Sequence, residues 1–164
     1  MALLIDDRAV VEDAYAHLDD DAPMPLTGAV TVTWDRWQHE RAALAKRPGK
    51  IGVRVPNTVE PHELAVALDG VSLVVIDFPK FTDGRGYSLA RLLREQHGYR
   101  GRLRAAGDVM RDQIFNMARC GFDQFSLKAG KDPHDALRAF DEFTVTCQPD
   151  ARGGAPIWKR RRPE

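Results

Sequence analysis

The stretch that decides the fold is residues 71–88, which read VSLVVIDFPKFTDGRGYS. Its first part, residues 71–76, is apolar enough for a strand that is covered on both faces. The following loop carries acidic and basic side chains and leads into a helical pattern in which Leu89, Leu92 and Leu93 form an apolar stripe. The stretch therefore joins a buried strand to a helix, and ligands gather beyond the carboxyl ends of such strands in open parallel sheets.

The same alternation of strand and helix runs along most of the chain. Strands are predicted at residues 29–32, 50–55, 71–76, 101–106 and 122–127. Thr33, Ser88, Asp108 and Asp132 stand where helix N-caps are expected. Short right-handed crossovers then favour an α/β fold, with a five-stranded, mainly parallel sheet and helices on both faces, as in flavodoxins and receiver domains. The alternative is half of a (β/α)8 barrel, because the pattern does not give the order of the strands.

Length and composition predict one domain with two distinct ends. A chain of 164 residues with 43% hydrophobic residues is sufficient for one continuous core. Residues 1–28 form an acidic segment with candidate edge strands, residues 29–147 the α/β domain, and residues 148–164 a basic tail that we expect to be mostly mobile.

The charge balance gives no reason to expect a nucleic acid or a membrane as partner. Lys and Arg together number 24, as do Asp and Glu, so the formal net charge is zero. The sequence contains no signal-peptide core and no apolar run long enough to cross a bilayer. We therefore expect a cytoplasmic protein in which Cys120 and Cys147 are reduced.

No cofactor or metal is evident from the motifs. The two cysteines form no Cys-x-x-Cys pair, and no two histidines are four residues apart. The segment from Gly84 to Leu89 begins like a dinucleotide-binding fingerprint but lacks the third glycine, and no Walker-type phosphate loop occurs. The motifs thus predict neither a nucleotide cofactor nor a metal centre.

Charged side chains follow two strands that we expect to be neighbours. Lys80 and Arg85 come after the third predicted strand, and Arg111 comes after the fourth. Backbone N–H groups near Gly84 and Gly86 add a helix N-terminus, where the dipole favours an anion. We therefore expect Lys80, Arg85 and Arg111 to bind a small anion.

Several further residues belong to this predicted site. Asp77 and Asp108 are the candidates for proton transfer, and the sequence does not identify which residue, if any, is catalytic. Asp83, Gly84, Gly86, Tyr87 and Asp112 complete the loops, as binding or interface residues. The alternative interpretation is an ion-pair network in which the same basic residues and the neighbouring aspartates hold two loops together.

The central part of the chain resembles a bacterial family of unknown function, DUF934. The resemblance rests on residues 78–88, on residues 90–94, on the segments 107–109 and 111–113, and on residues 119–123. It covers most of residues 27–145. Members of this family are labelled oxidoreductases of sulfite reduction, so the resemblance implies a place beside the sulfite reductase haemoprotein and the enzymes that deliver sulfite to it.

Two functions of different classes follow from these observations. The first, which we prefer, is an accessory protein of assimilatory sulfite reduction that associates with the sulfite reductase haemoprotein or a neighbouring pathway enzyme. The alternative is a small enzyme or anion-binding module that acts on a sulfur oxyanion or a phosphosulfate nucleotide at the carboxyl edge of the sheet. If the protein is an enzyme, the resemblance implies an oxidoreductase.

Overall fold

The computed structural model describes residues 2–151 and 153–160. Its strands form one eight-stranded sheet with the order β2-β1-β8-β7-β6-β5-β4-β3. The strands are β1 (Leu3–Asp6), β2 (Ala9–Glu12), β3 (Tyr15–His17), β4 (Ala29–Thr33), β5 (Ile51–Pro56), β6 (Leu73–Phe78), β7 (Arg102–Gly107) and β8 (Gln124–Phe125). The helices are α1 (Trp34–Leu44), α2 (Pro61–Val66), α3 (Arg85–Glu95), α4 (Arg111–Arg119), α5 (Pro133–Ala136), the 3-10 helix η1 (Leu137–Asp141) and α6 (Ile157–Arg160).

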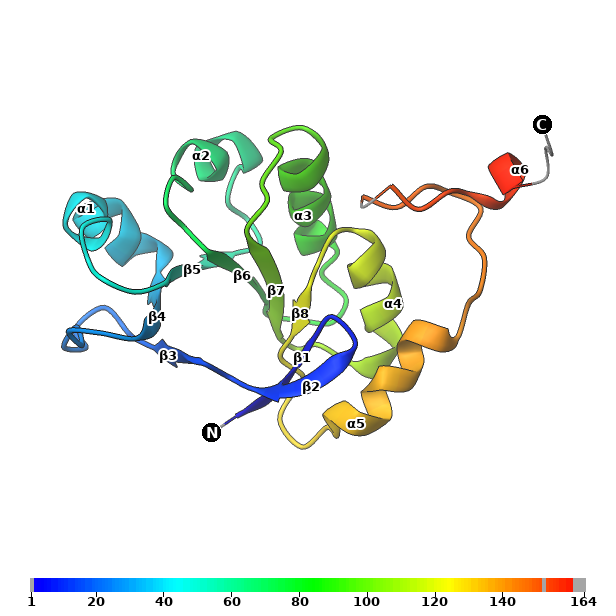
Figure 1. Cartoon of the computed structure of the whole chain (residues 1–164), viewed down its shortest axis with the longest axis horizontal. Helices are drawn as coiled ribbons and strands as arrows, with labels where there is room; N and C mark the ends of the chain where they lie inside the picture. The colour runs from blue at the N-terminus through cyan, green and yellow to red at the C-terminus, as the bar shows by residue number, and fades with distance from the viewer. Residues whose placement is uncertain (1, 152, 161–164) are drawn as a thin grey trace.

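Strands β3 to β8 are parallel and lie side by side in chain order, which determines where the helices lie. Right-handed crossovers between consecutive strands place all their helices on the same face of a sheet. Helices α1 to α4 accordingly follow the outer side of the curled sheet (Figure 1). The prediction of a mixed α/β fold is confirmed. The doubly wound sheet with helices on both faces is wrong, and the half-barrel alternative fits the structure.

Alternate residues of strands β4 to β8 face the helices and form the core. Val53, Ile76 and Leu103 are buried there together with Trp37 of α1 and Leu93 of α3. The Trp37 ring N–H donates a hydrogen bond to the backbone carbonyl of Ala67, 2.9 Å away. The remaining strand residues point to the inner face of the curled sheet, which the helices do not cover.

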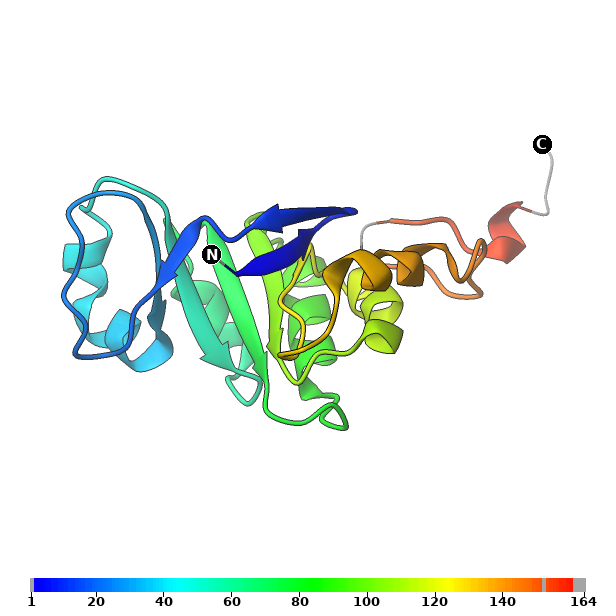
Figure 2. The same ribbon diagram turned by 90° about the horizontal axis from the view of Figure 1, so that it is seen from below.

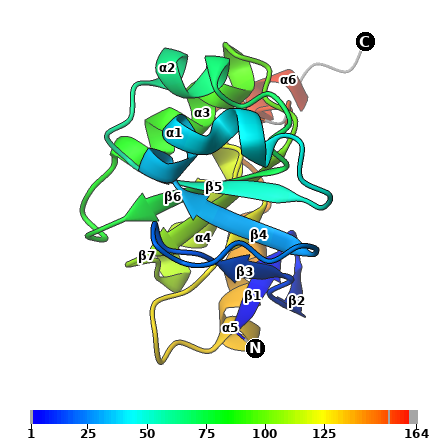
Figure 3. The ribbon, with the colours of Figure 1, turned by 90° about the vertical axis from the view of Figure 1, so that its left-hand side faces the viewer.

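The N-terminal segment brings the two edges of the sheet together. Strands β2 and β3 lie at opposite ends of the strand order, yet only Asp13 and Ala14 separate them in sequence. Each residue spans at most about 3.6 Å, so the two edges must lie close to one another. Helices α1, α2 and α3 lie on one side of β4 to β6, and the three N-terminal strands lie on the other (Figure 3). The inner face is therefore partly enclosed.

The C-terminal residues leave the body as an extended arm. The arm runs from the end of η1 to α6 and projects away from the sheet (Figures 1 and 2). The Ala151 N–H donates to the Arg119 carbonyl, 2.8 Å away, and the Ile157 N–H donates to the Thr146 carbonyl, 2.9 Å away. The last four residues, 161–164, which carry part of the predicted basic tail, lie outside the described residues.

Two of the four predicted helix caps are confirmed. The side chains of Thr33 and Asp132 accept backbone hydrogen bonds at the starts of α1 and α5. Ser88 is not a cap, because α3 already begins after Gly84. Asp108 is not a cap either, because its carboxylate accepts a hydrogen bond from the Phe81 N–H at 3.2 Å, in the loop after the neighbouring strand.

Candidate functional site

A row of inward-facing side chains crosses the inner face of the sheet. The pairing register places Arg54 of β5 opposite Val75 of β6, Val75 opposite Arg104 of β7, and Arg104 opposite Gln124 of β8. Adjacent strands are about 4.8 Å apart, so the two arginines leave their strands about 10 Å from one another. The inner face thus carries two cationic side chains, Arg54 and Arg104, with the apolar Val75 between them.

A cavity opens above this row, toward the carboxyl ends of the strands. The next row contains Asp77 opposite Ala106, and the cavity also includes Ser126, just after β8. Because Ala106 and Ser126 are small, the space between β6 and β1 remains unfilled. The cavity has a volume of about 610 Å³. Its lining also includes Leu4, Leu127, Thr33, Arg54, Arg104, Asp13 and His17. Active sites of complete (β/α)8 barrels lie at the corresponding end.

Arg104 is held by the segment that joins β2 to β3. Its guanidinium donates to both Asp13 carboxylate oxygens, at 2.6 and 3.0 Å, and to Gln124 Oε1 at 2.9 Å. The side chains of Arg104 and Asp13 are only 2% and 7% exposed. Burial raises the pKa of Asp13, but hydrogen bonds from His17 and Arg104 outweigh it and hold that pKa well below its usual range. The charge of Arg104 is therefore neutralised inside the protein.

His17 links the same segment to β4. Its Nε2 lies 2.8 Å from Asp13 Oδ2, and its Nδ1 lies 2.6 Å from the Thr31 hydroxyl. The Arg104 guanidinium also lies over the Tyr15 ring, with 5.7 Å between its central carbon and the ring centroid. These contacts fix the N-terminal segment across the inner face and form one wall of the cavity.

Arg54 is held less completely than Arg104. Its Nη2 donates to the Leu18 carbonyl at 2.5 Å and to Asp19 Oδ1 at 3.1 Å, and the Asp19 side chain is 91% exposed. The Arg54 Nε is buried and has no hydrogen-bond partner among the described residues. Buried N–H groups are normally paired, so the polar partners of Arg54 are incomplete among the described residues. Arg54 also belongs to the lining of the cavity.

Asp77, one of the two candidates for proton transfer, lines the same cavity. Partial burial raises the pKa of its carboxyl group, and the charge of Arg54 opposes this effect. No other side chain in residues 2–151 and 153–160 donates a hydrogen bond to it. Gly107 packs against it: a β-carbon there would lie 2.7 Å from Asp77 Oδ1, and the φ of Gly107 is 95°. A carboxyl group next to a cation in a cavity is suited to proton transfer or to binding a donor.

The basic residues predicted from the loops do not line this cavity. Arg85 is 62% exposed and forms two hydrogen bonds to Asp83 of its own loop, at 3.0 and 2.6 Å. Arg85 accordingly holds the pKa of Asp83 low, with help from Asn57. Lys80 is exposed and forms no ion pair with any residue that the structure describes. Gly84 and Gly86 lie at the start of α3, where the Gly86 backbone packs against the Phe78 ring.

Arg111 points to a different set of partners from Arg85. Its guanidinium lies 2.9 Å from Glu142 and 3.7 Å from Asp135, which follow the last strand. Asp108 pairs with Lys128 at 2.8 Å, and this contact holds the pKa of Asp108 low. The loops after β6 and β7 do meet, because Gln113 donates to the Phe81 carbonyl at 2.8 Å. The contacts resemble the ion-pair network that we gave as the alternative interpretation.

Tyr87 and Asp112 complete the predicted loop residues. Tyr87 is half-buried, with its ring 5.6 Å from that of Phe78, and burial raises its pKa to about 12. Asp112 is exposed in the first turn of α4. Tyr87 therefore has a role in packing, and neither residue reaches the cavity lining.

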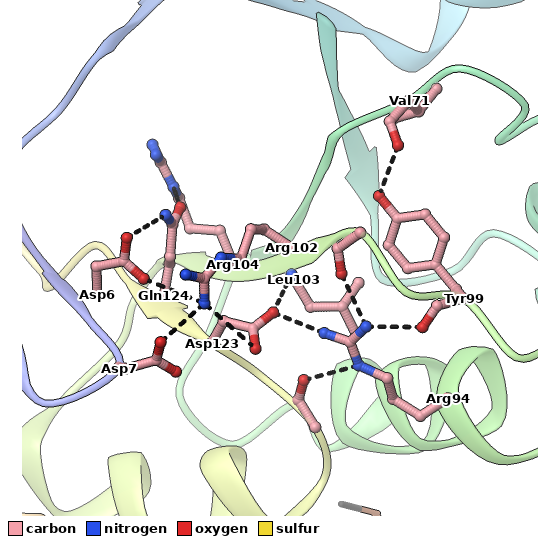
Figure 4. A network of polar contacts seen from close by, with 12 residues as sticks. Asp6, Asp7, Val71, Arg94, Tyr99, Arg102, Leu103, Arg104, Asp123 and Gln124 are labelled. Atoms are coloured by element: carbon pink, nitrogen blue, oxygen red, sulfur yellow. Dashed lines mark hydrogen bonds and ion pairs between the residues drawn. The ribbon is translucent and has the colours of Figure 1, made fainter. Parts of the chain in front are cut away.

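A second polar network lies at the opposite, amino-terminal end of β7 and β8 (Figure 4). Arg94 of α3 donates to the carbonyls of Tyr99, Gly101 and Gly121 and lies 2.6 Å from Asp123 Oδ2. The Leu103 N–H donates to the same Asp123 oxygen at 2.8 Å. The network ties α3 to two strands, and in barrels this end serves stability and not catalysis.

Of the side chains that line this cavity, the site predicted from the sequence includes Asp77 and does not include Arg54, Arg104, Asp13 or His17. Both arginines alternate with apolar neighbours, a pattern that also describes a strand with one face in water. The available signal was their position in a run of buried parallel strands, where helices cover one face and a charged residue must point to the other. Asp13 and His17 had no such signal, because they lie in a segment with an acidic composition.

Neither a metal centre nor a membrane helix is found in the part of the chain that the structure describes. Within it, no three His, Cys, Asp or Glu side chains are grouped so that they could hold an ion. No helix there is both long and apolar enough to cross a membrane.

Comparison with known proteins gives one match. No curated protein and no solved structure matches the chain. The family model described as "Bacterial protein of unknown function (DUF934)" matches residues 52–158. This range includes β6 to β8, all of β5 except Ile51, and both Arg54 and Asp77. This match covers more than half of the 164 residues. The chain therefore belongs to the DUF934 family.

Proposed function

We propose that this protein binds a sulfur oxyanion group in the cavity at the carboxyl end of the half-barrel, as part of sulfite reduction. The observation that carries the proposal is the place of Arg54 in the cavity lining, with an ion-pair partner, Asp19, that is 91% exposed. Its Nε also has no partner among the described residues. Guanidinium groups bind oxyanions through paired N–H donors. The label of the relatives that residues 77–123 resemble supports sulfur as the element.

Of the two arginines that line the cavity, Arg54 is the one that binds the anion. Arg104 is neutralised by Asp13, whereas the partner of Arg54, Asp19, is almost fully exposed. Exposed ion pairs contribute only about 0–1 kcal/mol, so an anion replaces Asp19 at little cost. Asp77 stands next to this position and supplies a group for proton transfer if the bound anion reacts.

The proposal is tested by titrating the protein with sulfite and with sulfate in a calorimeter at constant ionic strength. Arg54→Ala should lower the affinity at least tenfold, because it removes the counter-charge. Arg91→Ala is the matched control, because Arg91 forms an exposed pair with Glu95 on α3 and does not line the cavity. Unchanged affinity in Arg54→Ala would refute the cavity site, and a loss confined to Arg85→Ala would instead favour the predicted loop site.

The second candidate function, an accessory protein of the sulfite reductase haemoprotein, is favoured by the C-terminal arm. Phe143, Val145 and Trp158 are 60%, 46% and 57% exposed along this arm. Exposed aromatic side chains are typical anchors of protein interfaces. In a pull-down with purified reductase, Trp158→Asp should reduce capture. Leu26→Asp should not, although Leu26, in the loop between β3 and β4, is even more exposed at 88%. Equal capture of both variants would argue against this surface.

A further inference from the structure

The cavity is much larger than a free sulfur oxyanion. Its volume is about 610 Å³. A water molecule takes about 30 Å³ in the liquid, and sites for organic ligands span about 300–1,000 Å³. An ion of four or five heavy atoms at Arg54 therefore fills only a small part of this space. The remaining volume is suited to a carbon skeleton attached to the acid group.

Part of the cavity lining is apolar. Val75 and Ala106 form the floor between β5 and β8, and Leu4 and Leu127 lie at the far side of the cavity. Leu4 is only 2% exposed, so the accessible apolar surface of this apolar wall comes mainly from Ala106 and Leu127, which are half-buried. Covering such a surface contributes about 25 cal/mol per Å² of apolar area, and only a ligand with an apolar part gains this free energy.

Asp77 adds a second polar requirement next to Arg54. The two residues lie on adjacent strands and on the same face of the sheet, with Asp77 one row nearer the cavity mouth. They are close enough for the Arg54 charge to act on the Asp77 carboxyl group. A carboxylate that receives no hydrogen bond from another described side chain favours a cationic donor on the ligand. The pair therefore matches a molecule with an acid group at one position and an amino group nearby.

We propose that the ligand of this cavity is a small organic zwitterion. Its acid group binds Arg54, its amino group binds Asp77, and its carbon skeleton lies on Val75 and Ala106 and extends toward Leu4 and Leu127. This inference rests on the proposed function, since it uses the same arginine as the anion-binding group. The inferred ligand is thus an amino acid or an aminosulfonate, and not a free inorganic ion.

Three probes that differ by one feature at a time test the inference by calorimetry. Sulfate has no skeleton, propane-1-sulfonate adds the skeleton, and 3-aminopropane-1-sulfonate adds the amino group. The affinity should rise at least threefold at each step. Asp77→Asn should abolish the preference for the amino compound and leave propane-1-sulfonate binding unchanged, whereas Asp112→Asn, at an exposed position on α4, should change neither.

A substitution in the apolar wall tests the contribution of the ligand's carbon skeleton independently of its acid group. Leu127→Ser should weaken both sulfonates at least threefold and leave sulfate binding unchanged, since sulfate does not reach that wall. Leu127 is only partly buried and follows β8, so the substitution leaves the sheet core intact, and the far-UV circular dichroism of the variant checks this.

The outcomes distinguish the inference from the proposed function. If sulfate binds in an Arg54-dependent manner and both sulfonates bind no more tightly than sulfate, the organic ligand is refuted and the anion site stands. If the two sulfonates bind equally, the role of Asp77 is refuted. If none of the three probes binds, the anion site and the inference are refuted together.

Discussion

Replacing Asp13 by alanine should destabilise the protein strongly, because it leaves a buried cation without its counter-charge. The Arg104 side chain is 2% exposed and makes two hydrogen bonds to the Asp13 carboxylate, at 2.6 and 3.0 Å. After the substitution, Gln124 is the one remaining hydrogen-bond acceptor of Arg104 among the described residues. His17 loses its carboxylate partner in the same step.

The expected loss is about 3–5 kcal/mol, the usual cost of removing one member of a buried ion pair. Domains of this size are stable by about 5–15 kcal/mol in total, so the variant should retain its fold with a much smaller margin. Replacing both partners at once should cost far less, because no unpaired charge then remains. The double variant Asp13→Leu with Arg104→Met should therefore be more stable than Asp13→Ala alone.

Urea unfolding, followed by the fluorescence of the buried Trp37, measures these differences. Asp21→Ala is the matched control, since Asp21 is exposed in the same N-terminal segment and should change the free energy of unfolding by less than about 0.5 kcal/mol. A loss below about 1 kcal/mol for Asp13→Ala would refute the reasoning, because it would mean that Arg104 reaches water or another acceptor without cost.

The same ion pair predicts a pH dependence. The pKa of Asp13 is lower in the folded protein than its ordinary value of 3.8, so the unfolded chain binds the proton more tightly. The stabilisation is therefore fully present above about pH 5 and is lost as the pH falls below about 4, through the folded pKa. Asp13→Ala should unfold with a flatter dependence on pH in this acidic range.

Substitutions and chemical modification at other positions give further testable predictions. Gly86→Ala should lose up to about 2 kcal/mol, because its β-carbon would lie 2.5 Å from an aromatic carbon, whereas Gly84→Ala, with no atom within 4 Å, should be nearly neutral in urea unfolding. Arg94→Ala should cost about 3 kcal/mol in the same assay, because it removes the guanidinium that pairs with the largely buried Asp123 and donates to three backbone carbonyls. Iodoacetamide should modify the exposed Cys147 before Cys120, whose pKa is raised by burial, as mass spectrometry of peptides can measure.

The elements of the fold were predictable because their signals are local. Apolar runs such as residues 71–76 identify strands, and Asp132 followed by Pro133 identifies the start of a helix. The order of the strands was not predictable in this way. It depends on pairings such as Ile5 with Phe125, between residues far apart in the sequence. The order of the strands decides whether successive crossover helices lie on one face of the sheet or on both. The prediction of helices on both faces was wrong because it assumed a different order.

The candidate site was only partly predictable for a related reason. Asp77 could be named as a candidate because it lies near the end of a strand, and the end of a strand can be located from the sequence. Arg54 and Arg104 are separated by 49 intervening residues and become neighbours only through β6, which lies between them. The loop cations Arg85 and Arg111 had a clearer sequence signal, yet each lies beside carboxylates that are close to it in the fold.

The pairing of the first strand with the last has a consequence for biosynthesis. β1 leaves the ribosome early, but its partner β8 is made more than a hundred residues later. Until then the hydrophobic edge at Leu4 and Ile5 has only β2 beside it, and such unpaired edges are prone to aggregate. The Arg104–Asp13 contact likewise forms only after β7 has been synthesised. We therefore expect nascent chains that stall before β8 to expose an apolar N-terminal hairpin and to need protection from aggregation.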